Sequence, residues 1–290
     1  VLGRHAEALV SLDRALALQP DLREALNNRG NTLSALGRHD ESIAAFDRLL
    51  AQRPDDVEAA YNRGNALHAA GRPAAALAAY DAVIAARPGL AQAHNNRARA
   101  LQDLGQQAAA LAGYERAVAL APDYVHALVG RGTARLALKQ AAAALDDFDA
   151  ALRLDPRHAG AHEGRGAALF ALRRAAAALL AFTRALELDA TRLDARIQRG
   201  NASHELRRHA DAIADFDAVL AATPDAAGVA CNRGNALLEL KRYDEAARAF
   251  ERVLALDAAY PYALGKRVHA QAMACDWRGL DALVAQVDAG

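Results

Sequence analysis

The chain of 290 residues is long enough for two ordinary domains or for one long array. Hydrophobic residues make up 53% and aromatic residues only 5%, which favours helices over a sandwich of β-sheets. Its 35 basic and 35 acidic residues give none of the basic surplus typical of nucleic-acid-binding proteins, and no apolar run reaches the roughly 18 residues of a membrane span.

The predicted elements recur every 34 residues, and each period contains a pair of helices. A glycine recurs in the first helix, where it lets the second helix come close and seat an aromatic ring. These glycines are Gly30, Gly64, Gly132, Gly166, Gly200 and Gly234, with Ala98 as the exception. The facing large residues of the second helix are Leu12, Phe46, Tyr80, Tyr114, Phe148, Phe182, Phe216 and Phe250.

Proline ends most of the second helices, because it restricts the residue before it and cannot donate a backbone hydrogen bond. These prolines are Pro20, Pro54, Pro88, Pro122, Pro156 and Pro224, and alanine takes the remaining two places. A 34-residue period with this order of glycine, aromatic residue and proline resembles the tetratricopeptide repeat family. The resemblance covers nearly the whole chain. It implies an all-α fold, a right-handed superhelix of antiparallel helix pairs that stack because one pair cannot bury its apolar face alone.

In chain order, residues 1–22 supply only the second helix of an earlier repeat, so we expect an upstream helix to be missing. Its uncovered leucines should form an association-prone edge. These are Leu2, Leu9, Leu12 and Leu16. Seven full repeats occupy residues 23–260 and begin at residues 23, 57, 91, 125, 159, 193 and 227. Residues 261–290 are predicted to form degenerate capping helices, the last of which begins at Asp276 as its N-cap and carries Trp277.

The turn between the paired helices changes along the chain. It contains Gly3, Gly37, Gly71 and Gly105 in the first half, and Lys139, Arg173, Arg207 and Lys241 in the second. A left-handed backbone there would cost each later repeat roughly 1 kcal/mol. The alternative is a different turn in the later repeats, and the sequence does not decide between them.

An arginine precedes the glycine position in every full repeat, at a place that should be partly buried and therefore needs a charged partner. We expect the partner to be the acid of the preceding repeat, because the equivalent position in the second helix of Arg267's own repeat is Ala285, while Glu251 is available one repeat earlier. Pairing within a repeat and a basic stripe for phosphate are the alternatives. The expected pairs are Arg29 with Asp13, Arg63 with Asp47, Arg97 with Asp81, Arg131 with Glu115, Arg165 with Asp149, Arg233 with Asp217 and Arg267 with Glu251. Arg199 lacks such an acid, because Thr183 stands in its place.

The resemblance also implies that the first helices line a concave groove, and asparagine recurs on that face. The candidates are Asn28, Asn31, Asn62, Asn65, Asn96, Asn201, Asn232 and Asn235. An asparagine amide both donates and accepts hydrogen bonds, so a ladder of them can hold the main chain of an extended peptide. The alternative is that they only pack the helices. Gly130 and Gly164 interrupt the ladder, either by drift or to leave room near the backbone.

Motifs for catalysis are absent from the sequence: there is no phosphate-binding glycine loop and no nucleophilic serine motif. His158 and His162 lie four residues apart without an evident third ligand, so we expect no metal and no cofactor. Cys231 and Cys275 have no metal-binding or redox spacing, which fits a cytoplasmic setting. The basic residues with which tetratricopeptide domains hold a C-terminal carboxylate are also missing.

Three functions remain. The first is a non-catalytic scaffold that binds an extended peptide in the groove. The second is the substrate-recruiting arm of an enzyme. The tail from His269 to Gly290 is similar to the segment before the catalytic region in bacterial relatives of O-linked N-acetylglucosamine transferases (SPINDLY-type proteins). The residues that carry this likeness are Cys275, Asp276 and Trp277. The third is a self-associating array that dimerises through its N-terminal edge or convex face.

Overall fold

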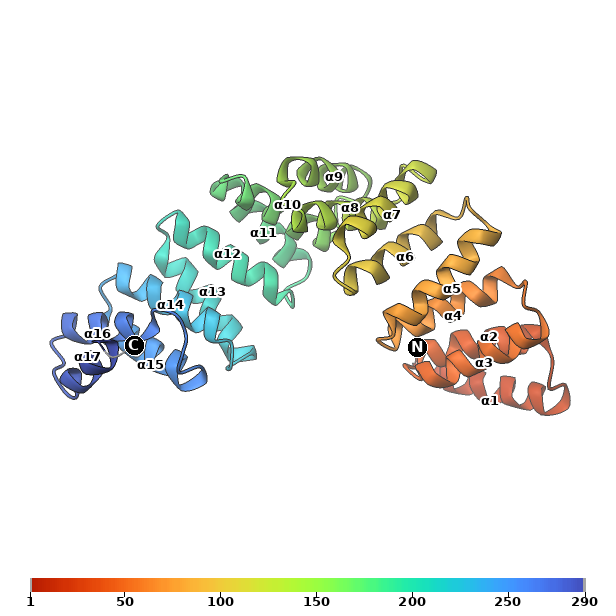
Figure 1. The fold of residues 1–290 in the computed structure, drawn as a ribbon, viewed down its shortest axis with the longest axis horizontal. Helices are drawn as coiled ribbons and strands as arrows, with labels where there is room; N and C mark the ends of the chain where they lie inside the picture. The colour runs from red at the N-terminus through yellow and green to blue at the C-terminus, as the bar shows by residue number, and fades with distance from the viewer. Residues whose placement is uncertain (1, 289–290) are drawn as a thin grey trace. The chain divides into compact units, whose positions relative to one another are not determined.

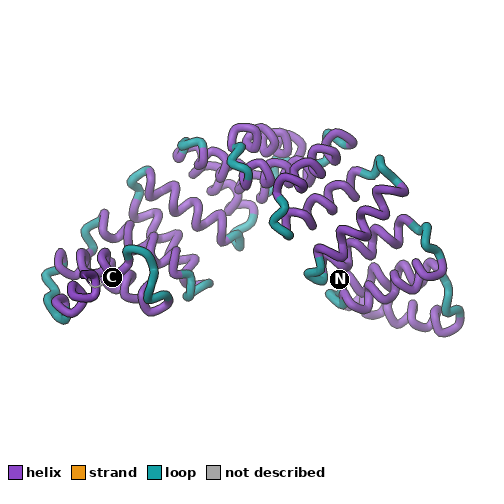
Figure 2. Tube along the Cα trace, viewed as in Figure 1, coloured by secondary structure: helices purple, strands orange, loops and turns teal. Residues whose placement is uncertain are grey.

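The computed structural model describes residues 2–288, which form 17 α-helices and no strand (Figures 1 and 2). The chain divides into two compact units, residues 1–154 and 155–290. Unit 1 contains α1 (Leu2–Leu18), α2 (Arg23–Ala35), α3 (His39–Gln52), α4 (Val57–Ala69), α5 (Pro73–Ala86), α6 (Ala91–Asp103), α7 (Gln107–Leu120), α8 (Val125–Ala137) and α9 (Ala141–Leu154). Unit 2 contains α10 (Ala159–Ala171), α11 (Ala175–Leu188), α12 (Leu193–Glu205), α13 (His209–Ala222), α14 (Ala227–Glu239), α15 (Tyr243–Leu256), α16 (Ala263–Met273) and α17 (Leu280–Asp288).

Within each unit, a helix packs on the helices before and after it in the chain. In unit 1, α2 packs on α3 and α3 on α4, and in unit 2, α12 packs on α13 and α13 on α14. The first helix of a pair also touches the first helix of the next pair, as α4 touches α6 and α12 touches α14. Each unit is therefore a stack of helix pairs, and the predicted all-α solenoid class is confirmed.

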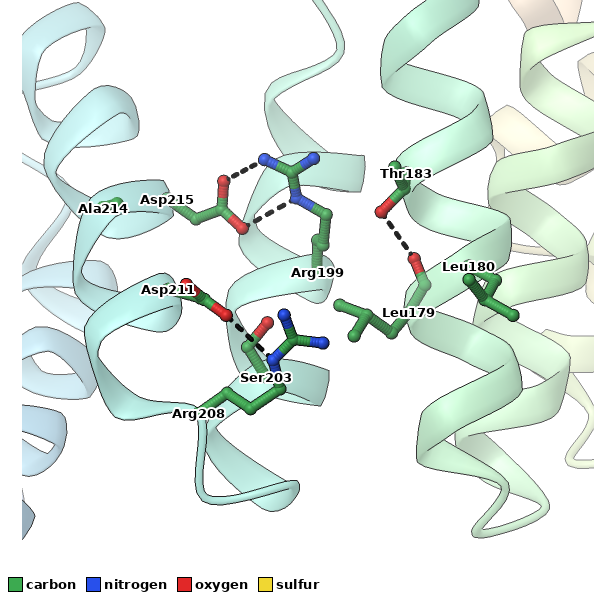
Figure 3. Close-up of a pocket in the computed structure, with 9 residues that line it drawn as sticks. All are labelled: Leu179, Leu180, Thr183, Arg199, Ser203, Arg208, Asp211, Ala214 and Asp215. Atoms are coloured by element: carbon green, nitrogen blue, oxygen red, sulfur yellow. Dashed lines mark hydrogen bonds and ion pairs between the residues drawn. The ribbon is translucent and has the colours of Figure 1, made fainter.

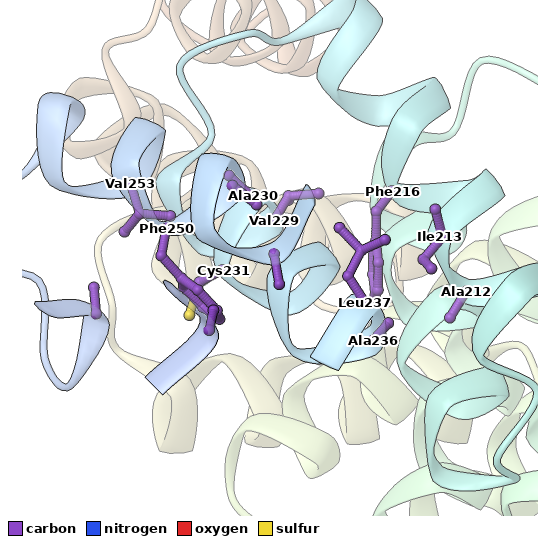
Figure 4. Packing of buried hydrophobic residues seen from close by; sticks show 14 of the residues in the cluster. Ala212, Ile213, Phe216, Val229, Ala230, Cys231, Ala236, Leu237, Phe250 and Val253 are labelled. Atoms are coloured by element: carbon purple, nitrogen blue, oxygen red, sulfur yellow. The ribbon is translucent and has the colours of Figure 1, made fainter. Parts of the chain in front are cut away.

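The glycines of the first helices accept aromatic rings, as the sequence predicts. A Cβ at Gly64 would lie 2.7 Å from the ring of Tyr80, and one at Gly234 would lie 2.8 Å from the ring of Phe250. Figure 4 shows Phe216 and Phe250 in the core of unit 2, where both rings are fully buried. Burial of rings of this size supplies much of the free energy that holds the pairs together.

The one alanine among these positions is compensated by two glycines on neighbouring helices. Where Ala98 faces Tyr114, the helix of Tyr114 carries Gly113, and a Cβ there would lie 2.9 Å from the Cβ of Ala98. On α8, a Cβ at Gly130 would overlap the ring of Tyr114. Gly130 therefore does leave room near the backbone, but the chain's own tyrosine occupies that room.

All the described turn residues share one left-handed geometry, which decides the question left open by the sequence. Gly37, Gly71 and Gly105 have φ of 72–74°. The non-glycine residues at the same place have φ of 58–61°. These are Lys139, Arg173, Arg207 and Lys241. The later turns are thus strained versions of the earlier ones rather than a different turn.

The N-terminal helix buries more of its apolar face than the sequence predicts. Leu9 is buried, and Leu12 and Leu16 are partly buried, so the prediction of an uncovered edge is wrong for Leu9; the side chain of Leu2 lies outside the described residues. Val10 and Leu18 are the large apolar side chains of α1 that are described as exposed, at 55% and 86%.

The last helix begins later than predicted. Asp276 binds the guanidinium of Arg278 at 2.8 Å instead of capping a helix, and α17 begins only at Leu280. Trp277 lies before the helix with 68% of its surface exposed. The Asp276 carboxylate also accepts from the backbone N–H of Arg278 at 3.2 Å, and Gly279, with a left-handed φ of 67°, separates these residues from the helix.

Candidate functional site

The asparagines of unit 1 lie on one face of successive first helices. Asn28 and Asn31 on α2 are exposed, and Asn62, Asn65 and Asn96 on α4 and α6 are partly buried. Residues three apart on a helix share a face, so Asn28 with Asn31 and Asn62 with Asn65 point to the same side.

Asn65 and Asn96 of the unit 1 ladder are engaged in hydrogen bonds within the chain. The Oδ1 of Asn65 accepts from the Nδ2 of Asn96 and from the hydroxyl of Tyr80, both at 2.9 Å. The same Nδ2 of Asn96 donates to the hydroxyl of Tyr61 at 2.9 Å, and its Oδ1 accepts from Asn95. Burial raises the pKa of both tyrosines, which keeps their hydroxyls protonated. These asparagines fasten α4 to α6.

Two residues that the sequence did not single out extend this network. The Nδ2 of Asn62 donates to the Oδ1 of Asn27, and Asn27 donates to the carboxylate of Glu58, each at 3.3 Å. Asn27 and Glu58 belong to neighbouring first helices, and their contact joins α2 to α4. The spacing of about one repeat between Asn27 and Asn62 was the signal that could have indicated it.

Unit 2 repeats the central bond of this ladder without its tyrosines. The Nδ2 of Asn232 donates to the Oδ1 of Asn201 at 3.0 Å, the counterpart of the bond between Asn96 and Asn65. The residues equivalent to Tyr61 and Tyr80, four repeats later, are Ile197 and Phe216. Without the hydroxyl of Tyr61, the amide of Asn232 keeps a spare N–H. Without the hydroxyl of Tyr80, the Oδ1 of Asn201 accepts, among the described residues, only from Asn232. The Oδ1 of Asn232 is also spare, because Cys231 stands where Asn95 stands in unit 1.

Asn235 makes fewer hydrogen bonds than Asn232, because the one contact of its Nδ2 with a described residue is with the sulfur of Cys231, at 4.0 Å. Asn201 donates to the side chain of Gln198 at 3.3 Å. The three asparagines of unit 2 together retain hydrogen-bonding groups that no other described residue uses.

These three asparagines line a pocket of about 550 Å³, which we call the groove pocket. The pocket lies along α10, α12 and α14, the first helices of three successive pairs. Its lining residues are Phe170, Arg173, Asn201, His204, Glu205, Phe216, Asn232 and Asn235. The surface combines the ring of Phe170, free amide groups and one residue of each charge, Arg173 and Glu205.

A histidine pair borders the groove pocket and was missed by the sequence analysis. The Nδ1 atoms of His204 and His209 lie 3.2 Å apart, so one ring donates to the other. His209 is 8% exposed, and its Nε2 lies 4.0 Å from the carboxylate of Glu239. Burial, and after it the neighbouring His209, lowers the pKa of His204 from its ordinary value of 6.5.

Five of the expected arginine–acid contacts are present. Arg29 lies 2.7 Å from Asp13, Arg63 2.5 Å from Asp47, Arg97 2.5 Å from Asp81 and Arg267 2.8 Å from Glu251, and Arg233 contacts Asp217. The acids in these pairs are about half exposed, which limits the stability that each pair contributes to roughly 1 kcal/mol.

The expected pair of Arg131 with Glu115 is wrong. Arg131 binds Asp147 of its own helix pair at 2.6 Å, and Arg135 binds the same carboxylate at 2.8 Å. Glu115 contacts Arg135 at 3.5 Å instead. The cause is the buried Asp147, which stands where most repeats have alanine and attracts the arginine of its own pair.

Like Arg131, Arg199 binds a buried aspartate of its own helix pair, Asp215, at 2.5 Å. The predicted pair of Arg165 with Asp149 joins residues of different units, and it stays a prediction.

The two candidate metal-binding histidines make hydrogen bonds to the backbone at the start of α10. The Nδ1 of His158 accepts from the backbone N–H of Ala161 at 3.0 Å, and the ring of His162 lies 3.0 Å from the carbonyl oxygen of Pro156. Among residues 2–288, no three histidine, cysteine, aspartate or glutamate side chains form a group that could hold a metal ion. None of the described helices has the length and apolar character needed to cross a bilayer.

Comparison with known proteins agrees with this geometry. A sequence model of the tetratricopeptide repeat matches residues 1–48, 27–91, 95–156, 131–192 and 197–263. No curated protein matches the chain.

Several solved structures are similar to the chain. YrrB, described as a tetratricopeptide repeat protein with an unusual peptide-binding site, has 24% identity and a TM-score of 0.55, over 64% of this chain and 96% of its own. A tetratricopeptide repeat protein from Parabacteroides merdae has 18% identity and a TM-score of 0.63, over 86% and 98%. The Cut9–Hcn1 assembly contains a chain with 16% identity and a TM-score of 0.72, over 93% and 53%. Likeness at these identities shows the fold.

Proposed function

Since the chain belongs to the tetratricopeptide repeat family, we propose that it is a non-catalytic scaffold that holds an extended peptide of a partner protein against its first helices. The groove pocket of unit 2 is the central contact site in this proposal. YrrB, which is similar in fold, is described as having a peptide-binding site, and that description supports the assignment by analogy.

The unused amide groups of the groove pocket carry the proposal. An extended peptide presents N–H and C=O groups along its length, and the amides of Asn232 and Asn235 can both donate and accept. The partly buried ring of Phe170 offers apolar surface beside them. Asn65 and Asn96 have the same spacing but are already bonded to tyrosines, so they hold the fold rather than a ligand.

The test uses a peptide selected from a random library on the intact protein and titrated by calorimetry. Asn235→Ala should weaken binding about 2- to 10-fold, because one hydrogen bond is lost. Ile197→Tyr with Phe216→Tyr should weaken it as well, since the added hydroxyls occupy the amides as they do in unit 1.

The matched control is Asn65→Ala in unit 1. It should lower the melting temperature, because it leaves the buried hydroxyl of Tyr80 without its acceptor, and it should leave peptide affinity unchanged. Equal affinity in wild type, Asn235→Ala and the double tyrosine variant would refute the groove pocket as the binding site.

A second candidate is the recruiting arm of a bacterial O-linked N-acetylglucosamine transferase-like enzyme. The family matches end at residue 263, and the exposed Trp277 in the following tail offers an apolar contact for a further domain. The gene sequence beyond Gly290 distinguishes the two candidates, since a nucleotide-sugar-binding region there favours the arm.

Self-association is the third candidate, and Val10 and Leu18 on α1 are the exposed apolar residues that favour it. Analytical ultracentrifugation of Val10→Glu with Leu18→Glu tests it. A dimer in the wild type that dissociates in the double variant supports this edge, and a monomer in both rules it out.

A further inference from the structure

A second pocket of unit 2, of about 340 Å³, shares no residue with the groove pocket. In Figure 3, α11 contributes Leu180 and Thr183 from one side, and α13 contributes Asp215 from the other. Arg199 and Ser203 of α12 lie between them, and Arg208 enters from the turn before α13. We call this the α11–α13 pocket.

The pocket exists because an acid is missing. At the other junctions of unit 2, Asp217 meets Arg233 and Glu251 meets Arg267. At the junction of α11 with α12 the acid is replaced by Thr183, whose hydroxyl donates to the carbonyl oxygen of Leu179 at 2.8 Å within its own helix.

Unit 1 shows the same site in a closed form. There, Arg131 and Arg135 bind Asp147, and Glu115 contacts Arg135. The equivalents two repeats later are Arg199, Ser203, Asp215 and Thr183. Thr183 thus replaces a glutamate and Ser203 replaces an arginine. The space that the two longer side chains would fill is the α11–α13 pocket.

The hydrogen-bonding groups left over in this pocket are mainly donors. Arg199 uses Nε and Nη2 on Asp215, which leaves Nη1, and Arg208 uses Nε on Asp211, which leaves both terminal nitrogens. Ser203 is 1% exposed, and its hydroxyl bonds to no other described residue. Both oxygens of Asp215 already accept from Arg199.

We infer that the α11–α13 pocket docks an acidic side chain of a partner protein, whose carboxylate takes the place left by Thr183. The carboxylate accepts from Ser203 and from the free nitrogens of the two arginines, a charge-assisted arrangement that is stronger than bonds between neutral groups. Leu180, 72% exposed at the rim, receives an apolar residue beside the acid. The preferred element is therefore a glutamate or aspartate next to a leucine-like residue.

The probe is the peptide acetyl-Leu-Glu-Leu-amide, titrated into the intact protein while the amide signals of residues 183 and 203 are followed by NMR. We expect saturable shifts at concentrations of about 1–10 mM, as suits a single anchored side chain. The uncharged acetyl-Leu-Gln-Leu-amide should bind roughly tenfold more weakly, because it forms no charge-assisted bonds. Equal binding of the two, tighter binding of acetyl-Leu-Arg-Leu-amide, or no shift with the glutamate peptide overturns the inference.

Two substitutions of Thr183 give a matched pair. Thr183→Glu supplies the acid within the chain, as Glu115 does, so it should abolish binding of the glutamate peptide while the melting temperature stays equal or rises. Thr183→Val keeps the pocket open and removes only a hydroxyl that bonds to its own helix, so binding should persist. Unchanged binding in Thr183→Glu contradicts the inference. Loss of binding in folded Thr183→Val contradicts it too.

Discussion

Among single residues, the arginines of the first helices are equal in sequence but not in environment. Among the described residues, Arg199 alone pairs with Asp215, which is 7% exposed, whereas Asp147 has both Arg131 and Arg135. Arg199→Ala should therefore cost about 3–5 kcal/mol in the free energy of unfolding, because it strands a buried charge. Arg131→Ala should cost less, and Arg29→Ala, whose acid is half exposed, under about 1 kcal/mol. Urea unfolding of the three variants gives the ranking, and equal costs would contradict it.

Glycines give a second contrast at this scale. Gly234→Ala places a methyl group 2.8 Å from the buried ring of Phe250 and should destabilise by about 1–3 kcal/mol. A Cβ at Gly265 on α16 would meet no atom within 4 Å, so Gly265→Ala should stabilise by up to about 1 kcal/mol through helix propensity. Thermal unfolding of both variants checks the signs, and a stabilised Gly234→Ala would contradict the close approach.

The histidine pair predicts how stability depends on pH. The pKa of His204 is lower in the folded protein than its ordinary 6.5, so below that value the unfolded chain binds protons that the folded chain does not. Stability is therefore fully present above about pH 6.5 and is lost as the pH falls below it. His204→Gln should flatten this loss, measured by melting temperature between about pH 5 and 7, while His269→Gln, an exposed control, should not.

Among the elements, the turns that join paired helices carry the clearest strain. Lys241 has a φ of 58°. In this left-handed region a residue with a Cβ loses roughly 1–2 kcal/mol of conformational free energy, whereas glycine has no Cβ to clash. Lys241→Gly should raise the unfolding free energy by about 1 kcal/mol, although glycine also loosens the unfolded chain. Lys241→Ala is the control, because it removes the charge but keeps the strain. An equal gain in both variants would assign the effect to charge.

The paired helices could be predicted from the sequence because the determinants are local and periodic. Glycine, aromatic residue and proline each act within one helix pair, so their 34-residue spacing indicates the element directly. The same applies to Arg29 and Arg63, whose acids lie at a constant separation.

The rest of the site could not be predicted, because it depends on exceptions to the period. Asp147 and Asp215 redirect an arginine by being buried, and burial of a single aspartate has no periodic signal. The difference between Asn96 and Asn232 lies in the hydroxyl of Tyr61 and the amide of Asn95, which only their contacts reveal.

At the scale of the whole molecule, stability should behave as a sum over neighbours. In unit 2, α16 packs on α15 and α17, so removing residues 261–290 takes away the α15–α16 and α16–α17 interfaces and leaves the others intact. The truncated protein should remain helical by circular dichroism and melt at a lower temperature. Loss of all helical signal on this truncation would show that the array folds only as a whole.

The two equivalent asparagine links also bear on how such an array evolves. Asn65 with Asn96 and Asn201 with Asn232 share their spacing and their mutual bond, but the second pair lacks the two tyrosine hydroxyls and the Asn95 amide that bond to the first. A recognition surface can thus arise when neighbouring residues lose their hydrogen-bonding groups, through substitutions that leave the two asparagines of the link in place. Because every pair of neighbouring repeats has the same two positions for asparagine, a binding site can be gained or lost at one junction without changing the others. The number of repeats therefore sets how many such sites one chain can carry.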